Sequence, residues 1–150
     1  MLKECIYFNS VALSRLLERE QTVAFAPLGL TPTQALALDL ILSTPGEVPA
    51  RLAEELCVTP STVSRVVDSL YRKGLIDRRQ REEDAREWSI FPTDAGEKLA
   101  PAIDRAYLTI SRVLHDKAGA DLVHTAVANM RELRNALSDP SPIEKRSLRK

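Results

Sequence analysis

Apolar residues recur along most of the chain at the three- and four-residue spacing of amphipathic helices. The first such pattern covers about residues 2–25 and is ended by Pro27 and Gly29. A second begins after Thr31, which is followed by a proline and then by a glutamine that can bond back to the helix cap. Its body, residues 35–42, is apolar nearly all round, which a helix tolerates only when it is buried on most sides. We therefore expect this second helix to be the centre of the core.

Two shorter helical patterns follow in close succession. Residues 50–56 have an apolar face and a charged face, and Thr59 with the proline after it begins a fourth helix that ends at Gly74. Only Cys57 and Val58 remain to reverse the chain between these helices. Such turns usually hold their first residue in the left-handed region, which glycine enters freely and a residue with a Cβ does not. We therefore predict a strained, positive φ at Cys57.

Beyond Gly74 the pattern changes from helical to extended. Two short runs, residues 75–79 and 87–91, flank the strongly charged segment 80–86. This arrangement predicts a β-hairpin with a polar tip. Trp88 is the largest apolar side chain in the hairpin, and we expect it to anchor the hairpin to the rest of the fold.

Two long helical patterns complete the periodic part of the chain. The first begins after Thr93, and its apolar stripe has alternating spacings of four and three residues, comprising Leu99, Ile103, Ala106, Ile110 and Val113. The second follows Gly119, and its stripe comprises Val123, Ala126, Met130, Leu133 and Leu137. The apolar faces of the first, fifth and sixth helices exceed what one small lobe can cover, which predicts a homodimer. Residues 140–150 carry four basic residues against one acidic residue and are predicted to be a disordered tail.

Composition narrows the class of protein. The 150 residues are 44% hydrophobic and 28% charged, as in an ordinary globular protein of one domain or two joined lobes. Lys plus Arg and Asp plus Glu both number 21, so any attraction to a polyanion must come from local clustering. The N-terminal region lacks the apolar core of a signal peptide, and no stretch is long enough to cross a membrane, so we expect a cytoplasmic protein. We find no phosphate loop, nucleophile elbow or metal motif, and we expect no enzyme activity, cofactor or metal.

Two helices joined by a tight turn and followed by a charged hairpin have the plan of a winged helix-turn-helix. The predicted fold is thus mainly α with a small β-hairpin wing. On the fourth helix, the face opposite the valines carries Ser61, Arg65, Asp68 and Arg72, flanked by Ser64 and Ser69. Hydroxyls at a helix N-terminus can hold a phosphate, and arginine can bond guanine in the major groove. The alternative is a solvated face on which Asp68 and Arg72 pair with each other.

The hairpin concentrates arginine where a wing would meet DNA. The segment from Arg65 to Arg86, with both ends included, contains seven basic and five acidic residues. An arginine at the tip of a hairpin can enter the minor groove. The acidic residues Glu82, Glu83 and Asp84 would repel phosphate unless they are paired or turned away, so a merely solvated loop remains the alternative.

Five segments in this order also match a known pattern. They are Leu52–Leu56, Thr59–Leu70, Lys73–Ile76, Asp84–Arg86 and Thr93–Gly96. In their order and in the lengths of the elements, they resemble the MarR family of bacterial transcriptional regulators. Two positions depart from the family pattern: Cys57 stands where members commonly have glycine, and Pro92 where a leucine usually precedes the threonine. These departures concern the local geometry of a turn and of a strand end.

The resemblance implies a dimeric winged-helix repressor or activator that binds a pseudo-palindromic operator in double-stranded DNA. It implies one regulator domain over residues 1–139, with a DNA-binding winged helix at about 32–92 and dimerisation helices at about 2–26 and 94–138. The predicted recognition-helix contacts are Ser61, Thr62, Ser64, Arg65 and Arg72. The predicted wing contacts are Arg78, Arg79, Arg81, Asp84 and Arg86, with Arg86 entering the minor groove and Asp84 steadying it.

Some features leave alternatives open. A cleft for a small-molecule effector between the two lobes is implied by the resemblance alone. Cys5 is either a peroxide-sensing thiol or an ordinary helix cysteine, and its surroundings in the sequence favour the latter. The alternative function is a winged-helix module that binds protein without specific DNA binding.

Overall fold

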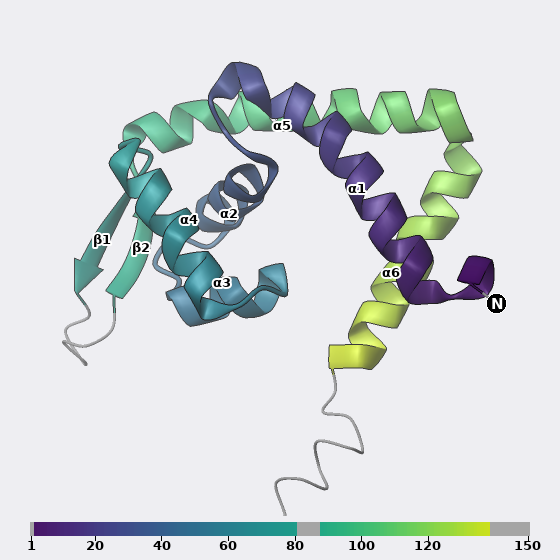
Figure 1. The fold of residues 1–150 in the computed structure, drawn as a ribbon. Coiled ribbons are helices and arrows are strands. Elements are labelled where there is room, and N and C mark those ends of the chain that lie inside the picture. Colours follow the sequence, from purple (N-terminus) through teal and green to yellow (C-terminus); the bar gives the residue numbers. More distant parts are fainter. Residues whose placement is uncertain (1, 81–87, 139–150) are drawn as a thin grey trace, which may run out of the picture. The chain divides into compact units, whose positions relative to one another are not determined.

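The computed structural model describes residues 2–80 and 88–138, and they are mainly helical (Figure 1). The elements in chain order are α1 (Ile6–Phe25), α2 (Pro32–Ser43), α3 (Pro49–Leu56), α4 (Pro60–Arg72), β1 (Ile76–Gln80), β2 (Trp88–Pro92), α5 (Asp94–Ala118) and α6 (Ala120–Ser138), with short 3-10 turns at Leu2–Glu4 and Ala26–Leu28. Each predicted helix and the predicted hairpin is confirmed, with ends displaced by a few residues. The predicted tail and the wing-tip residues Arg81, Asp84 and Arg86 lie outside the described residues.

The chain divides into two compact units, residues 1–110 and 111–150. The first unit contains α1 to α4, both strands and most of α5, and the second contains the end of α5 and α6. Within the described residues, no single helix is long and apolar enough to cross a membrane. The segments Ile6–Leu28 and Pro32–Ser43, which are bent by 68° relative to each other, reach the required length and apolar composition only when they are taken together.

The start of α2 has the predicted capping box. The Gln34 amide donates to Thr31 Oγ1 at 3.2 Å, and the Thr31 amide donates to Gln34 Oε1 at 3.1 Å. Behind this cap, Ala35, Leu38 and Ile41 have no exposed surface. The nearly all-apolar helix is therefore the central core helix, as predicted.

The turn between α3 and α4 confirms the prediction for Cys57. Its φ is 52° and its ψ is 42°, and among the described residues it is the only one other than glycine with a positive φ. The Cys57 amide donates to the Glu54 carbonyl at 3.1 Å, and the Val58 amide donates to the Ala53 carbonyl at 3.0 Å. These two bonds form a Schellman motif, which satisfies carbonyls at the helix end at the cost of a left-handed residue. Gly74 ends α4 with the same pair of bonds and a φ of 70°.

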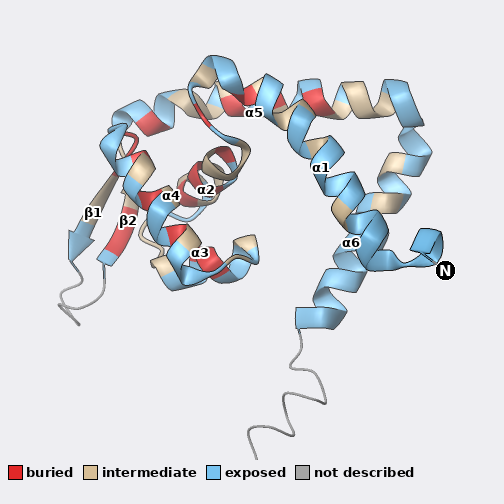
Figure 2. Ribbon diagram, viewed as in Figure 1, coloured by how far each residue is buried: buried red, intermediate tan, exposed pale blue. Residues whose placement is uncertain are grey.

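The core of the first unit is drawn from every element of the winged helix (Figure 2). Its largest fully buried side chains are Phe25, Leu38, Ile41, Leu52, Val63, Leu70, Ile76, Ile90 and Ile103. The side chains buried on α4 are Val63, Val67 and Leu70, which lie on its apolar side, so the opposite face of α4 is free to meet a partner.

The two strands are antiparallel, and Arg78 pairs with Ile90 in their register. Residue Glu47 adds an isolated bridge to Ile90, which fixes β2 to the segment before α3. Trp88 was predicted to anchor the wing, but this prediction is wrong, because Trp88 is 47% exposed whereas Ile90 is fully buried. Trp88 pairs with Gln80 at the end of the ladder farthest from the core, where fewer groups are available to cover it.

The residues that follow α4 pack closely against the start of α5. Thr93 Oγ1 donates to the Gly74 carbonyl at 2.6 Å, and the Thr93 amide donates to the Leu75 carbonyl at 3.1 Å. The Gly96 amide in turn donates to Thr93 Oγ1 at 3.2 Å. A Cβ at Gly96 would lie 2.2 Å from the Leu75 carbonyl oxygen, so any side chain there forces the backbone to move.

In the second unit, the described part of α6 has no buried residue. Its large apolar side chains are exposed, and they include Leu122, Val127, Met130, Leu133 and Leu137. The rings of His115 in α5 and His124 in α6 meet edge to face, with their centroids 5.2 Å apart. No group of three or more metal-binding side chains occurs among the described residues.

Candidate nucleic-acid interface

The N-terminus of α4 is a cluster of hydroxyl groups. Thr59 caps the helix by accepting from the Thr62 amide at 3.3 Å. The same hydroxyl lies 3.0 Å from Ser61 Oγ and 2.9 Å from Thr62 Oγ1. A helix N-terminus carries partial positive charge and amide groups that have no partner within the helix. This end of α4 therefore has the chemistry to hold a phosphate group.

The face of α4 opposite the core carries most of the predicted contacts. Ser61, Ser64, Arg65 and Arg72 are exposed, whereas Thr62 is half-buried beside the cap. Val63, Val67 and Leu70 on the other side are at most 4% exposed. The structure thus presents the short hydroxyls and two arginines together on one exposed helix face.

Ser69 departs from the predicted arrangement, because it faces α2 rather than the outer surface. Gln34 Nε2 donates to Ser69 Oγ at 2.9 Å, and Lys73 Nζ donates to Gln34 Oε1 at 2.8 Å. Lys73 Nζ also donates to the Gly29 carbonyl. These bonds attach the C-terminal half of α4 to the start of α2. The sequence pattern predicts Gln34 as a capping residue but gives no sign of this second role.

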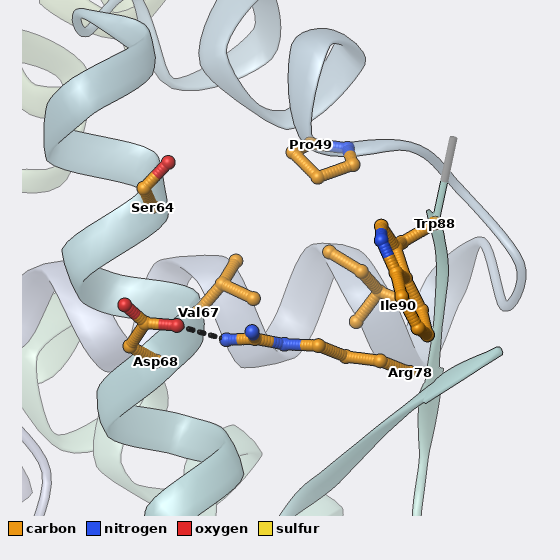
Figure 3. Close-up of a pocket in the computed structure, with 7 residues that line it drawn as sticks. All are labelled: Pro49, Ser64, Val67, Asp68, Arg78, Trp88 and Ile90. Carbon is orange, nitrogen blue, oxygen red and sulfur yellow. Dashed lines mark hydrogen bonds and ion pairs between the residues drawn. The ribbon is translucent and has the colours of Figure 1, made fainter. Parts of the chain in front are cut away.

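At the base of the wing, Arg78 is directed toward α4 (Figure 3). Its guanidinium forms an ion pair with Asp68, and its Cζ lies 5.0 Å from the centroid of the Tyr71 ring. Asp68 is therefore paired with the wing, not with Arg72 as the sequence alternative proposed. Arg78 also lines a pocket of about 100 Å³, together with Pro49, Ser64, Val67, Asp68, Trp88 and Ile90.

The neighbouring Arg79 has different surroundings. Its side chain is 65% exposed, its Cζ lies 4.5 Å from the centroid of the Phe91 ring, and its Nε lies 4.0 Å from Asp77 Oδ2. Successive residues of a strand point to opposite faces, so Arg78 and Arg79 belong to different sides of the hairpin. Of these two predicted wing contacts, Arg79 is the more accessible.

A second polar cluster lies near the point where α5 packs against the core. Burial raises the pKa of Tyr107 to about 12, and the charges of Asp39 and Asp104 add to this effect. Burial also raises the pKa of Asp39, with a further contribution from Asp104. The Tyr107 hydroxyl is buried without a hydrogen-bond partner among the described residues, while its ring meets Phe25 edge to face at 5.2 Å. The three ionisable residues lie on α2 and α5, so the cluster is separate from the predicted contacts on α4.

The capped α4, the two-residue turn before it and the hairpin after it define the molecule as a winged helix-turn-helix protein. Residues 30–88 match the model of the MarR family. The uncharacterized HTH-type transcriptional regulator YybA of Bacillus subtilis is 31% identical over 93 residues, which are 62% of this chain and 62% of that protein. The HTH-type transcriptional regulator PetP of Rhodobacter capsulatus is 30% identical over 105 residues, 70% of this chain and 61% of that protein.

Solved structures have the same fold. A MarR family regulator from Listeria monocytogenes, crystallised with a 26mer DNA, superposes with a TM-score of 0.79 at 22% identity, covering 91% of both chains. The likeness to the MarR family thus comprises the winged helix at residues 30–88, which matches the family model, and a shared fold over most of the chain. It matches less than two thirds of the length of the two curated relatives, 62% and 61%.

Proposed function

We propose that this protein is a transcriptional regulator that binds a specific sequence of double-stranded DNA as a homodimer. The observation that carries the proposal is the exposed face of α4, where Ser61, Ser64 and Arg65 lie beside a hydroxyl-rich helix N-terminus and next to the wing. Two relatives named as transcriptional regulators and the Listeria protein's complex with DNA support it.

Each part of this surface has a separate task in the proposal. Ser61 and Thr62, with the free amides of α4, hold a phosphate and set the register of the helix. Arg65 bonds a base edge in the major groove, and Arg72 and Arg79 contact the phosphate backbone. Arg81 and Arg86 keep the wing contacts predicted from the sequence, with Asp84 steadying Arg86.

The proposed dimer uses helices 2–26 and 94–138, and residues 32–92 bind DNA. The exposed apolar side chains of α1 and α6 support this division, because faces of this kind in water usually mark an interface. A two-fold dimer carries two copies of α4, so its operator is a pseudo-palindrome with half-site centres about 10 to 10.5 bp apart. We place the protein in the cytoplasm, where a bacterial operator is found, and propose that a small-molecule effector relieves repression.

The first experiment selects bound duplexes from random DNA and then measures how the affinity for the selected operator depends on salt. For a protein that neutralises phosphates, the logarithm of the binding constant falls linearly with the logarithm of the salt concentration. Inserting about 5 bp between the half-sites should abolish tight binding, because it turns one half-site to the opposite side of the helix. Failure to enrich any sequence would instead favour a winged-helix module that binds protein.

Replacing arginine by alanine separates base contacts from phosphate contacts. Arg65→Ala should cost about 1 to 3 kcal/mol on the operator and relax the preference at one base position. Arg86→Ala should lose most on operators with A·T-rich flanks, because those have a narrow minor groove. Equal losses on every sequence for both variants would reduce the proposed contacts to nonspecific charge.

A further inference from the structure

The two arginines in the middle of β1 differ in their surroundings although they are adjacent in sequence. Arg78 follows the alternation that begins at the buried Ile76, and it pairs with the buried Ile90 on β2. Residues directly opposite each other in a sheet share a face, so Arg78 lies on the side of the hairpin that packs against the core. Its position is that of a core-facing residue, and its side chain is only 30% exposed.

Arg78 makes two contacts with α4. Its guanidinium is paired with the carboxylate of Asp68 and lies over the ring of Tyr71, three positions further along the helix. The Nε nitrogen of the same guanidinium is buried and has no hydrogen-bond partner among the described residues. An arginine held over an aromatic ring and against a carboxylate is fixed in both direction and plane.

Without Arg78, the negative charge of Asp68 would oppose the proposed DNA binding. It lies on α4 between Arg65 and Arg72, and its side chain is 55% exposed. A free carboxylate at this position would repel the phosphates of DNA. Pairing with Arg78 balances that charge and turns it into an attachment point for the wing.

We propose that Arg78 is a positioning residue that clamps the wing to the recognition helix through Asp68 and Tyr71, and that it does not itself contact DNA. Arg79, on the other face of β1, makes the phosphate contact of this strand. This inference rests on the proposed function for its consequence in DNA binding. This proposal differs from the sequence prediction, which assigned both Arg78 and Arg79 to the residues of the wing that contact DNA.

The clamp can be tested without DNA, because Trp88 is the sole tryptophan of the chain and lines the same pocket as Arg78 and Asp68. Arg78→Ala and Asp68→Ala should each shift the fluorescence of Trp88 in the same direction, and the double variant should add little to either. The matched control, Arg79→Ala, should leave the emission unchanged. Far-UV circular dichroism verifies that each variant is folded.

The DNA arm measures affinity for the selected operator at several salt concentrations. Arg78→Ala should weaken binding about threefold to tenfold without changing the salt slope, the size expected from a partly exposed ion pair and one cation–π contact. Asp68→Ala should weaken binding similarly, although it removes a negative charge. Arg79→Ala should reduce the slope by about 0.9, as loss of one phosphate contact does. Arg78→Lys should recover binding in part, because it keeps the ion pair but loses the planar stacking.

Three results together would overturn the inference. Asp68→Ala would bind DNA more tightly, Arg78→Ala would have a reduced salt slope, and neither variant would change the emission of Trp88. If the wild-type protein binds no duplex, the proposed function fails. The fluorescence comparison then still decides whether Asp68 and Arg78 act as one unit.

Discussion

In α4 the side chains of Val63, Val67 and Leu70 are at most 4% exposed, whereas in α6 those of Leu133 and Leu137 are 45% and 82% exposed. Figure 2 shows the same contrast along the ribbon, with buried positions on α4 and none on α6. Both helices have regular apolar stripes in the sequence. A stripe therefore predicts that a helix has an apolar face, but not whether its own chain covers that face. We expect the winged helix to be stable through its own core, and α6 to depend on a second copy.

The largest expected effect tests how tightly the winged helix is packed. Gly96→Ala should destabilise the protein by about 3 kcal/mol, because the new Cβ would lie 2.2 Å from the Leu75 carbonyl oxygen. The control is the same substitution at Gly119, which has a φ of 84° and no atom within 4 Å of the added Cβ. Its cost should be that of a left-handed alanine, about 1 kcal/mol. Urea unfolding at matched protein concentration measures both, and a larger loss at Gly119 would contradict the comparison.

The next effect concerns the exposed stripe of α6. Leu133→Glu should weaken the dimer by about 2 kcal/mol or more, because it places a charge in a desolvated interface. The control, Asn135→Glu, makes the same change in charge about 160° away around the helix. Light scattering at micromolar concentration should then find monomers for Leu133→Glu and dimers for Asn135→Glu.

A monomeric wild type, or equal masses for the two variants, would remove the proposed interface. Circular dichroism should be nearly unchanged in the winged helix of Leu133→Glu, since that core is made within one chain. Loss of all structure on dissociation would show instead that the winged helix is not independently stable.

The same contrast explains what could be predicted from the sequence. Helix boundaries are encoded locally, by Thr31 and Thr59 at the starts of α2 and α4 and by Gly74 at an end, so they were predicted closely. Cys57 was predicted correctly for the same reason, because a two-residue turn leaves little choice of conformation. These predictions needed only residues within a few positions of each other.

The interactions that position the site join distant residues. The Gln34–Ser69 bond spans 35 positions, and the Arg78–Asp68 pair spans 10 and two kinds of secondary structure. The number of arginines in the hairpin led to the prediction that Arg78 contacts DNA. The alternation of side chains along the strand, counted from the buried Ile76, predicts instead that Arg78 faces the core. Trp88 was misassigned because its size suggested burial, whereas its place at the far end of the ladder leaves it 47% exposed.

A smaller effect compares the two ends of the helix-turn-helix. Cys57 and Gly74 occupy equivalent left-handed positions after α3 and α4, but only Cys57 carries a Cβ. Cys57→Gly should therefore stabilise the protein by less than about 1 kcal/mol, since relief of strain is offset by a more flexible unfolded chain. Cys57 is exposed, so little burial is lost. Cys57→Ala keeps the Cβ and should be nearly neutral; destabilisation by glycine in urea unfolding would show that the turn is not strained.

The smallest effect is at Tyr107, whose ring packs on Phe25, the one buried residue of α1. Tyr107→Phe keeps the ring contact and removes a buried hydroxyl that has no partner among the described residues. Removing such a group is neutral or slightly stabilising, so we expect a gain of about 0.5 kcal/mol or less at pH 7.

The pH dependence sharpens this prediction. Folding raises the pKa of Tyr107 from 10.0 to about 12, chiefly by burial and then by the charges of Asp39 and Asp104, so the folded state holds this proton more tightly than the unfolded state does. The wild type therefore keeps the contribution of Tyr107 to stability below pH 10 and loses it as the pH rises through about 12, whereas phenylalanine has nothing to lose. Urea midpoints of both proteins at pH 7 and at about pH 10.5 measure the difference, which should widen in favour of the variant at the higher pH. A difference that stays constant or narrows would mean that the hydroxyl is not buried, and that α1 is attached to the core more loosely than its one buried residue suggests.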